Sequence, residues 1–118
     1  MDERIKTQLA GADVDVDEML ARFNHNESLA MKFLLRFPDD PCFSQLKQGL
    51  AQQDIDLAYT AAHSLKGLSG NLSMKVLFRQ ATQVVDDLRR QDLPAAASKL
   101  GLLEAEYTRV VQALAQIQ

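Results

Sequence analysis

The chain has 118 residues, of which 47% are hydrophobic and 25% charged, and its formal net charge is −3. This size and composition are those of one globular domain rather than a disordered chain. The acidic balance argues against a nucleic-acid binder, and no polybasic run indicates binding to an anionic membrane. Cys42 is the single cysteine, so an intrachain disulfide or a cysteine-based metal site cannot form.

The N-terminus lacks the apolar segment of a signal peptide, and no stretch reaches the ~18 apolar residues of a membrane-spanning helix. We therefore expect a cytoplasmic protein that does not insert into membranes. We expect one domain over residues 1–118, with an N-terminal helical cap at about 1–38 and a bundle core at about 41–118. A self-contained bundle needs no second chain, so we expect a monomer.

Turn signals are sparse: the chain has five glycines, three prolines and no Asn-Gly or Asp-Gly hairpin signal, which favours helices over strands. Apolar residues recur at helical spacing in six segments, at 16–23, 29–37, 43–50, 55–72, 77–88 and 100–117. Asp15 and Asp54 are candidate N-caps. The alternation of three and four in the last segment is typical of a bundle helix. The sequence thus predicts an all-α fold, an antiparallel up-down four-helix bundle with additional short N-terminal helices.

Two further patterns have simple structural interpretations. The charged run "DDLRRQD" at residues 86–92 is typical of a solvated helix end. Met31, Met74, Phe33 and Phe78 are expected to fill the core rather than to form a special site.

The stretch "AAHSLKGLSGN" at residues 61–71 places two glycines inside a predicted helix, where each costs about 0.5–1 kcal/mol relative to alanine. On a helical wheel, Lys66, Gly67 and Gly70 share one stripe with His63, on the side away from the apolar residues. His63 is therefore expected to point outward. The glycines would leave the approach to the imidazole open, and Lys66 would lie near a negative group attached to it.

Neutral imidazole is a nucleophile near pH 7, so this arrangement suits phosphoryl acceptance on His63. Most lone surface histidines have no such role, and His25 is an example of that ordinary case. The glycines could also mark a loop at a helix end. The sequence has too few candidate ligands for a zinc site. A nucleophilic serine–histidine pair would need an oxyanion motif, and ATP chemistry would need a glycine-rich phosphate loop, and the sequence has neither.

The residues "AHSLKGLSGNLS" resemble the centre of histidine phosphotransfer (HPt) domains, in which a histidine is followed by a leucine, a lysine and a glycine. His63, Leu65, Lys66 and Gly67 match that pattern, and the similarity covers roughly residues 46–92. The resemblance implies that His63 takes a phosphoryl group from an aspartyl-phosphate on a response-regulator receiver domain and passes it to another receiver. Lys66 would stabilise the phosphohistidine, and Gly67 and Gly70 would keep the approach open.

The same resemblance implies a relay protein rather than an enzyme, since the receiver and its Mg²⁺ supply most of the chemistry. No cofactor is expected in this chain, and the expected partners are receiver domains and a hybrid sensor histidine kinase.

Two points concern the hairpin formed by the two helices around Ser73. Family members usually have glycine where this chain has Ser73, so we expect an altered turn. If the chain reverses near Ser73, Gln83 is level with His63 and can hydrogen-bond its second ring nitrogen, although a solvated Gln83 is an equally good expectation.

Two other functions compete with the relay. One is a helical docking module that binds receivers without phosphate chemistry. The other is a kinase dimerisation domain, in which the phosphorylated histidine normally has an acidic neighbour and a proline downstream, whereas Ser64, Leu65 and Lys66 follow His63 here.

Overall fold

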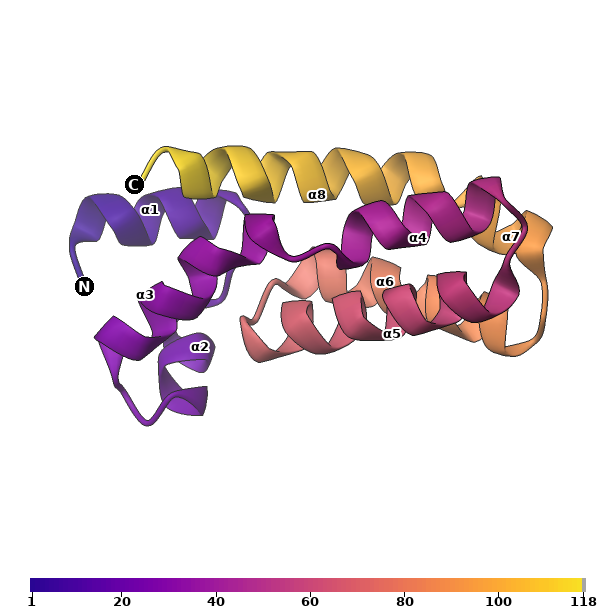
Figure 1. The fold of residues 1–118 in the computed structure, drawn as a ribbon. Coiled ribbons are helices and arrows are strands. Elements are labelled where there is room, and N and C mark those ends of the chain that lie inside the picture. The colour runs from indigo at the N-terminus through magenta and orange to yellow at the C-terminus, as the bar shows by residue number, and fades with distance from the viewer. Residues whose placement is uncertain (118) are drawn as a thin grey trace.

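Helices form most of the computed structural model, which describes residues 1–117 (Figure 1). In chain order they are α1 (Glu3–Gly11), α2 (Val16–Arg22), α3 (Glu27–Arg36), the 3-10 helix η1 (Phe37–Asp39), α4 (Cys42–Ala51), α5 (Ile55–Asn71), α6 (Lys75–Arg89), α7 (Leu93–Ser98) and α8 (Leu100–Ala115). Helices α4, α5, α6 and α8 run side by side as the bundle, and α1–α3 gather at one end. The predicted all-α bundle with short N-terminal helices is confirmed.

Side-chain caps fix the starts of the two helices that matter most for the site. Asp15 accepts a hydrogen bond from the backbone N–H of Glu18 at 3.1 Å, which starts α2. Asp54 does the same for Leu57 at 3.1 Å, which starts α5. Both predicted N-caps are confirmed, and each is worth about 1 kcal/mol of stability.

The core runs through the middle of the bundle and continues under the N-terminal helices. Its fully buried large side chains come from α1, α2, α3, α4, α5, α6 and α8 as well as the α5–α6 turn: Leu9, Met19, Leu34, Leu46, Leu65, Met74, Leu77, Leu103 and Leu114 are among them. At the side of the core the Phe43 ring of α4 stacks on partly buried Tyr107 of α8, with ring centroids 4.1 Å apart. Within residues 1–117, no helix is both long enough and apolar enough to span a membrane.

Three side chains differ from the sequence-based expectations. Phe33 is 44% exposed and Phe78 is 39% exposed, so neither is core filling. Asp87 belongs to the charged run expected to be solvated, yet it is buried and forms ion pairs with Arg90 and Lys99. The hydrophobic periodicity misplaced these residues because it describes a helix's own faces but not what its neighbours cover.

Helix boundaries also differ from the prediction in two places. The N-terminal helix α1 has few apolar residues and buries Leu9, so the periodicity did not single it out. The segment predicted at 100–117 corresponds to α8, and the structure adds the short helix α7 before it, which ends next to Lys99. The Lys99 amine reaches back to buried Asp87. The ion pair between Lys99 and Asp87 joins the break between α7 and α8 to α6, and hydrophobic periodicity does not detect such pairs between helices.

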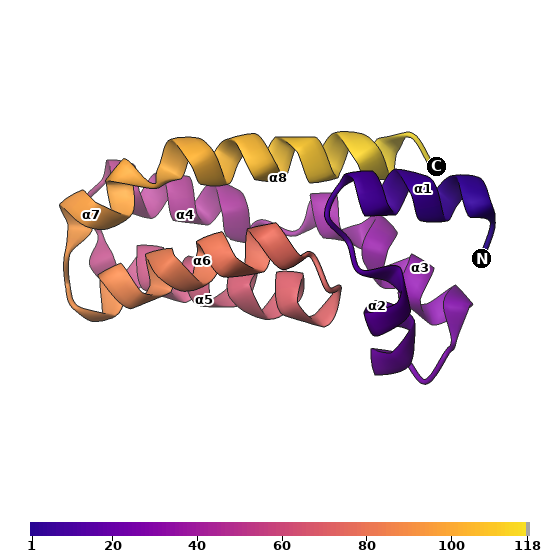
Figure 2. The same ribbon diagram turned by 180° about the vertical axis from the view of Figure 1, so that it is seen from behind.

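The loop between α1 and α2 runs alongside the α5–α6 turn (Figure 2). Val14 and Met74 form an antiparallel bridge. The backbone N–H of Asp15 donates to the carbonyl of Ser73 at 2.9 Å, and that of Lys75 donates to the carbonyl of Asp13 at 3.0 Å. These bonds hold α2 beside the turn that follows α5. The division into a cap at 1–38 and a core at 41–118 stays a prediction.

A second attachment lies at the other side of the cap, where α1 packs along α8. Arg109 of α8 donates to the carbonyl of Gly11 at 2.6 Å and pairs with Asp13 and with buried Glu106. Burial raises the pKa of the Glu106 carboxyl, while the neighbouring guanidinium opposes that rise. The cap is therefore anchored both to the α5–α6 turn and to α8.

Candidate functional site

His63 lies in the middle of α5, and its side chain is exposed. The opposite face of the helix is buried through Ala58, Ala62 and Leu65. Helix α5 continues to Asn71, so Gly67 and Gly70 are interior helix residues and the alternative of a loop is wrong. The predicted outward orientation of His63 is confirmed.

Tyr59 stands one helical turn before His63 and packs near its ring. The two ring centroids are 6.0 Å apart, with planes tilted by 41°. Arg89 of α6 donates a hydrogen bond to the Tyr59 hydroxyl at 3.4 Å. Sequence reasoning missed Tyr59, although the spacing of four residues on a helix was a sufficient signal for the contact.

A pocket of about 340 Å³ opens beside His63 between α5, the start of α6 and α2. It is lined by residues of all three helices and the turn: Glu18, Arg22, His63, Lys66, Gly67, Ser69, Gly70, Asn71, Ser73, Met74, Lys75 and Phe78. The structure thus brings His63, Lys66, Gly67 and Gly70 together, as predicted. It also adds charged residues from α2 and α6 that no sequence pattern placed there.

The two glycines have different surroundings. A Cβ added to Gly67 would meet no atom within 4 Å, so that position faces open space beside the histidine. A Cβ added to Gly70 would lie 3.0 Å from two ring carbons of Phe78. The absence of a side chain at Gly70 therefore lets the Phe78 ring lie against α5, and its predicted part in keeping the approach to His63 open stays a prediction.

Lys66 is half-buried on the same stripe as His63, and within residues 1–117 its amine forms no ion pair or hydrogen bond. A lysine that is not neutralised by a carboxylate leaves a positive charge next to the imidazole. Such a charge favours a negative group at that position.

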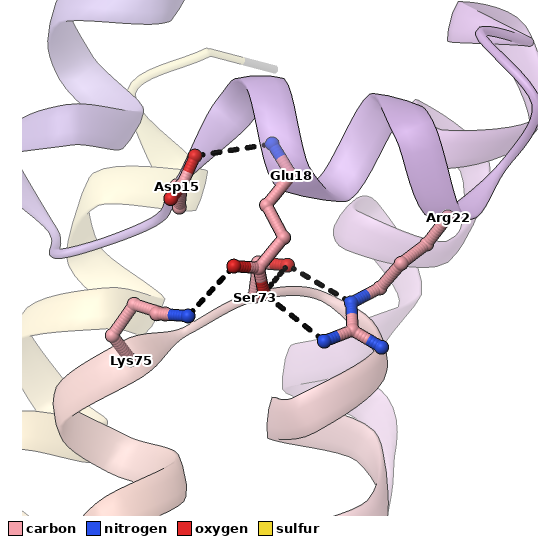
Figure 3. A network of polar contacts seen from close by, with 5 residues as sticks. All are labelled: Asp15, Glu18, Arg22, Ser73 and Lys75. Atoms are coloured by element: carbon pink, nitrogen blue, oxygen red, sulfur yellow. Dashed lines mark hydrogen bonds and ion pairs between the residues drawn. The ribbon is translucent and has the colours of Figure 1, made fainter.

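A polar network joins α2 to the edge of the pocket (Figure 3). The Glu18 carboxylate accepts hydrogen bonds from Lys75 at 2.7 Å, from Arg22 at 3.0 Å and from the Ser73 hydroxyl at 3.0 Å. These bonds, the one from Lys75 foremost, lower the pKa of the Glu18 carboxyl to about 2. Glu18 is therefore an anion at neutral pH, held between two cations.

Ser73 forms the turn between α5 and α6 and has a positive φ of 53°. Glycine adopts this left-handed region at little cost, which explains why glycine is usual there in the resembled family. The serine hydroxyl is buried, donates to Glu18 and accepts a 3.3 Å hydrogen bond from Arg22 Nε. The expected altered turn keeps glycine-like backbone geometry and gains a side-chain link to α2.

Gln83 is exposed on α6 and, within residues 1–117, forms no hydrogen bond with His63. Gly70 faces Phe78, and Tyr59 contacts Arg89. The midpoint of each pair in the sequence is position 74, so the antiparallel helices place position 85 beside position 63. The residue level with His63 is therefore Val85, which is buried. The reversal thus lies one residue later than expected, which shifts the facing position by two residues.

The described residues 1–117 contain no group of three or more His, Cys, Asp or Glu side chains placed to hold a metal ion. The groups that the pocket brings together are an imidazole, nearby cations and an open face of the helix. This set of groups can hold a phosphoryl group covalently and neutralise its charge.

Comparisons with known proteins agree with this geometry. The family model described as "Hpt domain" matches residues 39–113. The crystal structure of the HPT domain from a sensor hybrid histidine kinase of Shewanella superposes with a TM-score of 0.75 at 23% identity, covering 90% of this chain and 93% of that one. At this identity the likeness shows the fold. A search of curated proteins finds no match.

Proposed function

Because the chain belongs to the Hpt domain family, which carries out histidine phosphotransfer in two-component phosphorelays, we propose that His63 accepts the phosphoryl group. The observation that carries this proposal is the exposed imidazole in mid-helix, bordering a pocket with Lys66 and with the open face of Gly67. The donor is a receiver domain phosphorylated on aspartate, and a second receiver is the acceptor.

In the proposed first step, an imidazole nitrogen of His63 uses its lone pair to attack the phosphorus of the aspartyl-phosphate. The N–P bond forms as the P–O bond to the aspartate breaks, and the carboxylate leaves with that electron pair. The other ring nitrogen keeps its proton, so no proton acceptor is required. In the second step an aspartate of the next receiver attacks the phosphorus and the electron pair of the N–P bond returns to the ring.

The surroundings of His63 favour positioning and charge stabilisation over acid–base catalysis. The open face of Gly67 admits the partner's active site, and Lys66 faces the charge of the phosphoryl group. The Mg²⁺ ion of the reaction belongs to the receiver in this proposal. The protein acts as a monomeric carrier in the cytoplasm, between a hybrid sensor histidine kinase and response regulators.

The test mixes the protein with phosphorylated receiver domains encoded in the same genome and follows the label. Transfer to wild type should give an adduct that is labile to acid and stable to base, and His63→Gln should take up no label. Label uptake by His63→Gln at the wild-type rate would remove His63 from the reaction. Receiver binding by both proteins without label transfer would instead identify a docking module.

A further inference from the structure

We propose that Arg22, on the N-terminal helix α2, is a second cation for the phosphoryl group that His63 carries, acting together with Lys66. This inference rests on the proposed phosphoryl transfer to His63. Arg22 lies outside residues 39–113, which the family model matches, so this contribution comes from the N-terminal cap.

The first observation is the position of Arg22 at the pocket. It lines the same cavity of about 340 Å³ as His63 and Lys66, across from α5. Its side chain is about half exposed, and it also borders a neighbouring apolar groove with Phe23, Phe33 and Leu68. A group attached to the imidazole therefore borders the same pocket as Arg22, about 15 Å from it, because Arg22 is bonded to Ser73, ten residues beyond His63.

The second observation is that the guanidinium is held in place before any phosphate arrives. Arg22 Nε donates to the Ser73 hydroxyl at 3.3 Å, and Nη2 donates to Glu18 at 3.0 Å (Figure 3). The guanidinium keeps its full positive charge while it makes these two bonds, because arginine stays protonated in proteins. It is therefore a fixed source of positive potential at the pocket.

The third observation is the charge of the pocket. Its lining contains three cations, Arg22, Lys66 and Lys75, and one anion, Glu18, which leaves a net of two positive charges. A phosphoryl group carries about two negative charges near neutral pH. Without Arg22 the lining would have a net of one positive charge, half of what balances the phosphoryl group. Glu18 tethers the guanidinium and at the same time weakens its field at the histidine.

This arrangement predicts opposite effects for two variants that break the same ion pair. Arg22→Gln removes a positive charge from the pocket, and Glu18→Gln removes a negative one. If the pair only fastened α2 to the bundle, both variants would change the site in the same direction. If Arg22 interacts with the phosphoryl group, the two variants will move the site in opposite directions.

The experiment phosphorylates each protein with a labelled receiver domain and measures two quantities. One is the equilibrium ratio of phosphorylated His63 to phosphorylated receiver. The other is the pKa of the phosphoryl group, followed by ³¹P NMR over the neutral pH range. Arg4→Gln is the control, since Arg4 is an exposed cap arginine that lines no pocket described above.

For Arg22→Gln we expect the phosphoryl pKa to rise by about 0.2 unit, as for loss of a unit charge about 15 Å away in a water-like medium. The equilibrium ratio should fall by roughly 1.6-fold, which corresponds to the same energy. Glu18→Gln should lower the pKa and raise the ratio, Arg22→Lys should keep part of the wild-type values, and Arg4→Gln should change neither.

Shifts of the same sign in Arg22→Gln and Glu18→Gln would overturn the proposal, as would equality of Arg22→Gln with Arg4→Gln. Circular dichroism of each variant confirms that the helices are intact, and Arg22→Lys serves as the test if Arg22→Gln does not fold. A wild-type protein that takes no label from any receiver would be the failure of the phosphotransfer itself, which is distinct from either result.

Discussion

Replacing Gly67 with alanine should make the protein more stable and a poorer phosphoryl acceptor. Gly67 lies in the interior of the 17-residue helix α5, where glycine is unfavourable relative to alanine by about 0.5–1 kcal/mol. An added Cβ meets no atom within 4 Å, so no packing penalty offsets that gain. The new methyl group occupies space next to His63 that the partner's active site would use.

The size of the effect follows from the length of the chain. At about 2.1 cal/mol/K per residue, 118 residues have an unfolding entropy of about 0.25 kcal/mol/K. A gain of 0.5–1 kcal/mol therefore raises the Tm by about 2–4 °C. Displacement of the approaching phosphoryl donor by about 1 Å should slow transfer roughly ten- to a hundredfold.

Thermal unfolding followed by circular dichroism measures the first effect, and label transfer from a phosphorylated receiver measures the second. Gly49→Ala is the matched control at a crowded glycine, because its Cβ would lie 2.6 Å from the Ala58 backbone nitrogen and 2.8 Å from its Cα. Overpacking of this kind costs about 1–3 kcal/mol, so Gly49→Ala should lower the Tm. A lower Tm for Gly67→Ala, or an unchanged transfer rate, would refute this reasoning.

Two further predictions concern charged groups. The pKa of Glu18 falls from 4.5 to about 2 in the folded protein, mainly through Lys75. Its contribution to stability is therefore full above pH 4.5 and is lost as the pH falls toward 2. In urea titrations at different pH values, Glu18→Gln should reduce the loss of stability in acid, and an unchanged pH profile would contradict this prediction. Asp87→Ala removes the buried carboxylate that pairs with Lys99 and Arg90. The same titrations should show a free energy of unfolding lower by about 1.5–3 kcal/mol. A loss below about 0.5 kcal/mol would show that the two ion pairs contribute little to stability.

The helices and the central histidine could be predicted from sequence because their signals are local. The Asp15 and Asp54 caps, the apolar stripes and the stripe containing His63 and Lys66 each depend on residues within a few positions of one another. Such short-range patterns specify a helix and its faces before any tertiary contact is known. The order of the four bundle helices followed from the short connections between them.

The rest of the site depends on contacts between residues far apart in the chain. Glu18 and Arg22 meet Ser73 across 55 and 51 positions, and no periodicity links such positions. The hairpin register differed by one residue at the turn, which was enough to put Val85 rather than Gln83 opposite His63. Phe78 was assigned to the core because a helical stripe does not reveal that its partner position is a glycine.

The serine in the α5–α6 turn makes the cap and the family segment depend on each other. Its left-handed backbone is unfavourable for a residue with a Cβ by roughly 1 kcal/mol, and its hydroxyl finds its partners in Glu18 and Arg22. A protein shortened to residues 39–113 would retain that strained turn with a hydroxyl deprived of both partners. For this chain, unlike one with glycine at the turn, the α5–α6 turn of the family segment is supported by side chains of the cap.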